Sequence, residues 1–376
     1  MVGEGPYEPF LLVDTRGIVV EPVRSWVREL ATNDQSLRTV RAYCHALLTW
    51  YRVLWMVGTP WERATELDTA ALVGWMRIAR NPQRRRRPDA AAAGTVNIKT
   101  GKPLLGPGYR PATINLTLAA VHAFYGFHSY WHRGPMCNPV PASPQRRRAL
   151  MHRSPIEPEP VFRRARYRQK QPVQAPRSIP DHLWGELFGA MSCDRDRALL
   201  AAYVSSGARA SELLGVRAED LDWARRRVWV VSKGSRERRM APLSPEAMFW
   251  LGRYLDAEGL PVAGEPVWRT RRGRPLTYAA MWRVMQRANE VLGTNWTLHD
   301  LRHTAAVRMT SSAALTLPDV QVVLGHRDVR TTGRYTAPRV EELCDRLQEF
   351  HARPPAPPRR LAAGYDPADV AVVFGG

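Results

Sequence analysis

A basic, proline-rich segment at residues 139–177 separates two parts of the chain and restricts it to a fold with two independent cores. The segment holds many prolines, the run Arg146-Arg147-Arg148 and few apolar residues from which a core could form. Such a composition is typical of an extended linker. With 376 residues, the chain is long enough for a domain of ordinary size on either side. We therefore expect a lead-in at 1–20, domains at 21–138 and 178–350, and a tail at 351–376.

The part before the linker has the periodicity of helices. Between residues 40 and 54, apolar side chains recur at steps of three and four, which places them on one helical face. Similar patterns occupy residues 68–79 and 112–125. A polar stretch with several glycines and prolines interrupts them at 81–111 and includes the run Arg84–Arg87. The pattern predicts a helical bundle with one long insertion. Its arginine run is either a DNA-binding patch or exposed to solvent, and we prefer the second interpretation.

The part after the linker is mostly helical and contains one hairpin. Residues 227–231 alternate as a strand does, 233–236 supply a turn and 237–243 return. Ser244 and Pro245 then have the chemistry of a helix start. Further helices are predicted over 278–291, 298–310 and 317–324. The predicted fold class is therefore mainly α with a small β-hairpin or sheet, in two domains.

The charge of the chain limits the partners that it can bind. A formal net charge of +20 and a pI near 10.6 favour a polyanion, either nucleic acid or an acidic membrane surface. The alternative is an excess of arginine that is merely solvated. No run of about 18 apolar residues occurs, and the N-terminus lacks the pattern of a secretory signal. We expect a soluble, cytoplasmic, nucleoid-associated protein without a membrane partner.

The segment from His299 to His303 carries side chains that suit phosphate chemistry. His299, Arg302 and His303 have the spacing i, i+3, i+4 and so share one face of a helix. The guanidinium of arginine binds phosphate oxygens bidentately and stays protonated. His299 and His303 also have the spacing of a zinc pair. The arginine beside them and the lack of a nearby cysteine ligand argue against zinc. We expect neither a metal nor a cofactor, since the four cysteines lie apart and no phosphate-binding loop is present.

Four blocks in this part occur in a fixed order and together resemble the tyrosine recombinase (phage integrase) family. Tyr335 follows Arg302 by 33 residues, as the family pattern requires. The resemblance covers residues 178–340 by motif, and the helical N-terminal domain looks like the family's core-binding domain, with the two domains forming a clamp. The blocks are Ser205–Leu213 with Arg209 and Glu212, Lys233 in the hairpin turn, His299–His303, and Leu324–His326 followed by Tyr335.

The resemblance implies a role for each polar residue of these blocks. Arg209 and Arg302 would hold the scissile phosphate and stabilise the transition state. Lys233 would be the general acid that protonates the leaving 5′ oxygen, and Tyr335 would be the nucleophile that becomes a 3′-phosphotyrosine. His299 and His326 would donate hydrogen bonds to phosphate oxygens. Glu212 and His303 would support the site.

Several of these assignments have alternatives. Arg236, Arg238 or Arg239 of the hairpin is an alternative DNA contact to Lys233, although an ammonium group releases its proton more readily than a guanidinium. Tyr335 has the alternative of a core tyrosine. The two supporting residues have alternatives as well. Glu212 could instead form a surface salt bridge, and His303 could be a buried structural histidine.

The resemblance implies a site-specific recombinase that integrates or excises a mobile element. Its partners would be double-stranded DNA recombination sites, three further copies of the chain in a tetrameric synapse, and accessory DNA-bending or directionality proteins. A type IB topoisomerase-like enzyme and a catalytically silent DNA-binding module are the alternatives. The apolar end of the tail, residues 369–374, docks either on a neighbouring protomer or on its own domain.

Overall fold

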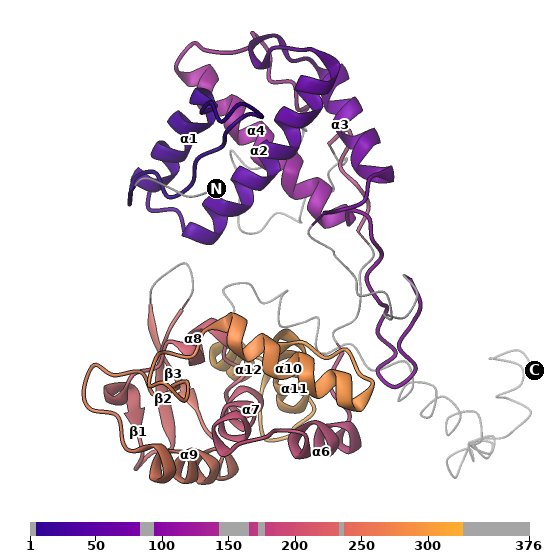
Figure 1. The fold of residues 1–376 in the computed structure, drawn as a ribbon. Coiled ribbons are helices and arrows are strands. Elements are labelled where there is room, and N and C mark those ends of the chain that lie inside the picture. The colour runs from indigo at the N-terminus through magenta and orange to yellow at the C-terminus, as the bar shows by residue number, and fades with distance from the viewer. Residues whose placement is uncertain (1–4, 83–93, 143–164, 172–176, 233–236, 326–376) are drawn as a thin grey trace, which may run out of the picture.

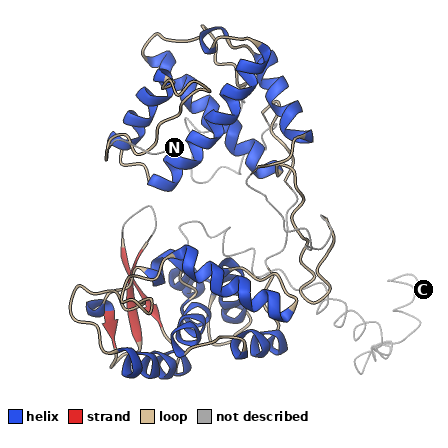
Figure 2. Cartoon of the chain, in the orientation of Figure 1, coloured by secondary structure: helices blue, strands red, loops and turns tan. Residues whose placement is uncertain are grey.

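The computed structural model describes residues 5–82, 94–142, 165–171, 177–232 and 237–325, and all structural statements refer to these residues. They form two bodies, a helical one from the N-terminal part and a mixed one from the C-terminal part (Figures 1 and 2). Each body has its own cluster of buried apolar side chains, without a shared core. Within the described residues, no helix is both long and apolar enough to cross a membrane.

The N-terminal body packs four helices around buried aromatic side chains. Trp50 and Phe124 are fully buried, and the indole nitrogen of Trp50 donates to the Tyr125 hydroxyl over 3.1 Å. The second helix begins where the Ser36 hydroxyl accepts a hydrogen bond from a backbone amide, and it ends at Gly58 in the left-handed conformation. The helices are α1 (Glu21–Thr32), α2 (Leu37–Val57), α3 (Glu66–Ile78) and α4 (Pro111–Tyr130), with a 3₁₀ turn η1 (Trp61–Arg63).

The insertion between α3 and α4 contains a narrow hairpin. Its two arms join where the Leu104 amide donates to the Thr95 carbonyl over 2.8 Å and where Val96 pairs with Pro103. We call residues 94–104 the insertion hairpin. Figure 1 shows it leaving the N-terminal body and reaching the C-terminal body. The sequence predicted only a polar loop here, because the hairpin is too short to show strand alternation. The arginine run Arg84–Arg87 lies outside the described residues.

The C-terminal body surrounds the apolar helix α7 with helices and one small sheet. Leu199, Leu200 and Tyr203 of α7 are fully buried, as expected for a helix covered on every side. The sheet is antiparallel with the order β1-β2-β3. The elements of the C-terminal body are α6 (Asp181–Gly189), α7 (Asp194–Ser206), α8 (Ala210–Leu214), η2 (Ala218–Asp220), β1 (Leu221–Asp222), β2 (Arg227–Val231), β3 (Arg238–Pro242), α9 (Pro245–Glu258), α10 (Tyr278–Leu292), α11 (Leu298–Thr310) and α12 (Leu317–Leu324).

The predicted fold class is confirmed. The predicted helix at 298–310 has the bounds of α11, and the predicted strand at 227–231 is β2, paired with β3 so that Trp229 lies opposite Met240. The sequence missed β1, which adds a third strand. A strand of two residues leaves no period that a sequence pattern can reveal.

Candidate active site

Helix α11 begins at a turn that also places the first site residue. Asp300 accepts hydrogen bonds from both the amide and the hydroxyl of Thr297 over 2.7 Å, which closes a capping box around the first turn. His299 lies inside this turn and is exposed. Its ring contacts that of His303 edge to face, with centroids 4.2 Å apart. The two histidines thus share one helical face, as their spacing predicted.

Arg302 lies on the same helix but is buried, with 4% of its surface exposed. Its Nη1 donates to the Gly207 carbonyl and its Nη2 donates to the Leu324 carbonyl, each over 2.7 Å. Gly207 comes two residues before Arg209, and Leu324 two residues before His326. One guanidinium therefore fastens α11 to the segments that lead into two other predicted site residues.

Gly207 permits this close approach of three segments. It ends α7 in the left-handed conformation with φ +59°. A Cβ atom at this position would lie 2.6 Å from Cδ2 of Leu324 and 3.5 Å from Cβ of Ala305. Only glycine satisfies both the backbone angle and the space here.

Glu212 is buried beneath the site. Its side chain is 1% exposed, and it accepts hydrogen bonds from the amide of Arg209 over 2.9 Å and from Nη1 of Arg209 over 2.7 Å. Nη2 of Arg239 donates to it as well, over 2.8 Å. Burial opposes the charge, but the hydrogen bonds from Arg209 and Arg239 outweigh burial and hold the pKa of Glu212 below its usual value. The alternative of a surface salt bridge for Glu212 is wrong, because the carboxylate is buried and shared by two arginines.

Arg239 is the polar residue of this region whose position the sequence analysis missed. Besides Glu212, it binds the Val323 carbonyl through Nη1 over 2.6 Å. A Cβ on Gly325 would lie 2.9 Å from its Nε. By contrast, Arg238 is half exposed and pairs with Asp220 over 2.8 Å. The period of two along β3 contains the signal, since Arg239 shares the face of the buried Ala241.

The remaining predicted site residues cannot be placed. Lys233, His326 and Tyr335 all lie outside the described residues, as does Arg236. The structure does describe the residues that flank 233–236 and the residue before His326. The Ser232 amide donates to the Glu237 carbonyl over 2.8 Å, which closes the base of the hairpin around 233–236. Gly325, the last described residue, caps α12 with φ +62°.

The surroundings of His299 lower its pKa and so keep its ring neutral over a wider pH range. Desolvation by the neighbouring protein atoms lowers the pKa most; Asp300 opposes this effect, while the charges of Arg302, Lys102 and Arg209 lower the pKa further. A neutral imidazole can donate one hydrogen bond and accept another. As for the zinc alternative, the described residues contain no group of three or more ligands that could hold a metal ion.

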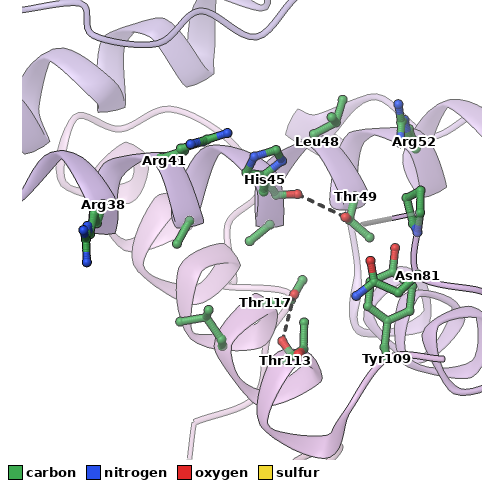
Figure 3. Close-up of a pocket in the computed structure, with 14 residues that line it drawn as sticks. Arg38, Arg41, His45, Leu48, Thr49, Arg52, Asn81, Tyr109, Thr113 and Thr117 are labelled. Atoms are coloured by element: carbon green, nitrogen blue, oxygen red, sulfur yellow. Dashed lines mark hydrogen bonds between the residues drawn. The ribbon is translucent and has the colours of Figure 1, made fainter. Parts of the chain in front are cut away.

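A second candidate region is a basic groove on the N-terminal body. Helices α2 and α4 and the segments at 81–82 and 109 enclose a groove of about 580 Å³ (Figure 3). Arg38, Arg41 and Arg52 stand on α2 with His45 among them, all exposed or partly exposed. Their spacing places them on one side of the helix, away from the buried face that contains Val40 and Leu47. Burial and the charge of Arg41 lower the pKa of His45.

One residue of the groove contacts the C-terminal body. The guanidinium of Arg38 lies over the ring of Tyr278, 5.4 Å from its centroid, at the first residue of α10. None of the three arginines forms an ion pair with an acidic residue of the described chain. The resemblance implies a DNA-binding role for this domain, and the helical spacing of these side chains opposite the apolar stripe is the signal in the sequence that marks them.

Comparisons with known proteins give one consistent result. Residues 187–342 match the model of the phage integrase family. A tyrosine recombinase XerD of Pseudomonas aeruginosa is 37% identical over 165 residues, which are 42% of this chain and 53% of that protein. The chain spans about half the length of the curated relatives that it matches.

Solved structures agree with this family at the level of the fold. The chain superposes on a lambda integrase (75–356) dimer bound to a COC′ core site with a TM-score of 0.58, at 16% identity, covering 86% of this chain and 96% of that one. A lambda integrase tetramer bound to a Holliday junction gives a TM-score of 0.55 at 16% identity, covering 82% of this chain and 77% of that one. Both likenesses extend over the N-terminal and the C-terminal body.

Proposed function

Because the chain belongs to the phage integrase family of tyrosine recombinases, we propose that it cuts and rejoins DNA at specific sites through a covalent 3′-phosphotyrosine. The observation that carries the proposal is that Arg302 binds the Gly207 carbonyl, two residues before Arg209, whose side chain Glu212 holds. His299 lies on the same helix as Arg302. A set of fixed cations and hydrogen-bond donors is what a phosphoryl transition state requires.

The proposed reaction needs no metal and no nucleotide. The phenolic oxygen of Tyr335 releases its proton to water as it attacks phosphorus, and the bond from phosphorus to the 5′ oxygen breaks. Lys233 gives the leaving 5′ oxygen a proton. Arg209 and Arg302 stabilise the charge that develops on the non-bridging oxygens. The phosphotyrosyl bond retains the energy of the original phosphodiester. A 5′ hydroxyl of another strand can therefore displace the tyrosine and reseal the backbone.

We assign contacts with the phosphates and the major groove of DNA to the basic face of α2. An α-helix fits the major groove of B-DNA, and exposed arginines at helical spacing can reach base edges and phosphates. Arg38, Arg41 and Arg52 meet this requirement, since they line one side of the groove shown in Figure 3. The net charge of +20 supports the same partner.

Trapping of the covalent intermediate tests the proposed chemistry. A nicked suicide DNA substrate loses the strand that would reseal, so the wild-type protein should accumulate a protein–DNA adduct in a denaturing gel. Tyr335→Phe should bind the same DNA without forming an adduct. Tyr130→Phe, at an exposed tyrosine of α4, is the matched control and should trap DNA like the wild type. An adduct that persists in Tyr335→Phe would refute the nucleophile assignment.

A plasmid assay separates recombination from the other candidate functions. We propose that the protein exchanges strands between two recombination sites as a tetramer, in the integration or excision of a mobile element. Two-site plasmids should then yield recombinant products, and the protein–DNA complex should have the mass of four chains. Relaxation of supercoiled DNA without exchange would favour a topoisomerase-like enzyme. Binding without any adduct would favour a silent DNA-binding module.

A further inference from the structure

The tip of the insertion hairpin binds the segment that connects α10 to α11. Asn97 donates through Nδ2 to the Gly293 carbonyl over 2.9 Å. Asn295 donates in turn through Nδ2 to the Lys102 carbonyl over 3.2 Å. The hydroxyl of Thr100 adds a hydrogen bond to the side-chain oxygen of Asn295. An element of the N-terminal body is thus fixed to the segment that leads into α11, about 195 residues away in sequence.

Lys102 extends this contact into the first turn of α11. Its ammonium group forms an ion pair with Oδ2 of Asp300, whose side chain is only 8% exposed. The same oxygen accepts the two hydrogen bonds from Thr297 that close the capping box. One carboxylate oxygen therefore joins the hairpin to the turn that begins the helix. Because Lys102 is itself three-quarters buried, this ion pair is less screened by solvent than a surface pair.

The turn that Lys102 binds is the one that orients the site. Asp300 stands between His299 and Arg302 in sequence, and fraying of the first turn would move His299 directly. The lysine also balances the negative charge of Asp300 next to a site that is to receive a phosphodiester. Its charge reaches His299, where it contributes to the lowered pKa. A cation at this place therefore offsets the charge of Asp300 and holds the start of the helix in one geometry.

We propose that Lys102 is a positioning residue of the active site, supplied by the N-terminal domain, which acts through Asp300 to hold His299 and Arg302 toward the scissile phosphate. This inference rests on the proposed function. It couples the two domains, since the hairpin belongs to the body whose groove we assign to DNA. Binding of the N-terminal domain to DNA then influences how well the first turn of α11 is ordered.

The test compares two lysines of the same hairpin tip in the full-length protein. Lys102→Met keeps the apolar stem and removes the charge. Lys99→Met is the matched control, because the half-exposed Lys99 only approaches Glu186 at 3.7 Å. With saturating suicide DNA, Lys102→Met should form the adduct at least about tenfold more slowly, a loss of about 1.4 kcal/mol in transition-state stabilisation. Its Kd for DNA should change less than about threefold, as it removes no proposed DNA contact.

Rescue and amide exchange complete the test. Lys102→Arg keeps the cation and should cleave within about threefold of the wild type, since arginine also pairs with a carboxylate. Hydrogen exchange of the amides of residues 298–304 should accelerate in Lys102→Met and stay unchanged in Lys99→Met. Wild-type cleavage by Lys102→Met, or an equal loss in Lys99→Met, would overturn the inference.

The amide-exchange result also keeps the inference separate from the proposed chemistry. A wild-type protein that forms no adduct contradicts the proposed function. The link between Lys102 and α11 is still decided by exchange in that case, because exchange needs no cleavage. Unchanged exchange at residues 298–304 in Lys102→Met contradicts the link.

Discussion

Replacement of Glu212 by glutamine tests whether the buried carboxylate organises the site. Glu212 accepts three hydrogen bonds of 2.7–2.9 Å from two arginines, with 1% of its side chain exposed. Glutamine preserves the shape but offers one acceptor, and its amide nitrogen then faces a guanidinium donor. Removal of one partner from a buried ion pair costs about 3–5 kcal/mol. Since Arg209 is 35% exposed and can regain water, we expect the lower end of this range.

The expected loss is large enough to measure by thermal unfolding. A destabilisation of roughly 3 kcal/mol lowers the Tm of a domain of this size by about 6–12 °C. Loss of the carboxylate also frees the side chain of Arg209, and misplacement of a catalytic group by about 1 Å can slow a reaction by roughly 100-fold. Glu186→Gln is the matched control. Glu186 is 44% exposed and pairs with Lys99 only at 3.7 Å, so its loss should change the Tm by little.

The pH dependence of the same variant gives an independent check. The pKa of Glu212 in the folded protein lies below its usual 4.5, so the carboxylate stabilises the fold fully above that pH. This contribution is lost as the pH falls through the lowered pKa. The difference in unfolding free energy between wild type and Glu212→Gln should therefore be constant near neutrality and shrink in acid below 4.5. A variant with the wild-type Tm and wild-type rate of adduct formation would refute the reasoning.

Three further predictions concern the backbone, the histidine and the groove. Gly207→Ala should lower the unfolding free energy by about 2–5 kcal/mol in denaturant titration, because φ is +59° and the new Cβ meets Leu324 at 2.6 Å. The lowered pKa of His299 means that the unfolding free energy should rise with pH up to 6.5, and His299→Gln should flatten that rise. Arg41→Ala and Arg52→Ala should each reduce the slope of log Kd against log salt by roughly one, measured by fluorescence anisotropy; an unchanged slope would exclude the phosphate contact.

Local patterns predicted the parts of the site that one helix contains. The spacing of His299, Arg302 and His303 is a property of a single helix, and α11 has the predicted bounds. The hairpin was visible for the same reason, since alternation over 227–231 is local. These features depend on neighbours along the chain, which a sequence displays directly.

Contacts between distant segments were not predictable in the same way. Arg302 binds the Gly207 carbonyl, 95 residues away, and every residue offers a carbonyl, so no residue type marks the acceptor. Glu212 is buried because two arginines converge on it, one of them 27 residues later. The insertion hairpin looks like a polar loop in sequence because its partners, Asn295 and Asp300, lie in the other body.

The C-terminal end of α12 shows why the site should respond to substitution as one unit. The last carbonyls of a helix have no partner within the helix and form the negative end of its dipole. Here Arg239 of β3 binds the Val323 carbonyl and Arg302 of α11 binds the next one, at Leu324. Arg239 also binds Glu212, which holds Arg209.

Two cations thus determine where the chain leaves α12 just before His326, and one of them shares a carboxylate with Arg209. Residues that share partners in this way give non-additive effects. Arg239→Lys and Glu212→Gln should therefore cost together much less than the sum of their separate losses in adduct formation, and full additivity would mean that the two ends of the network act independently.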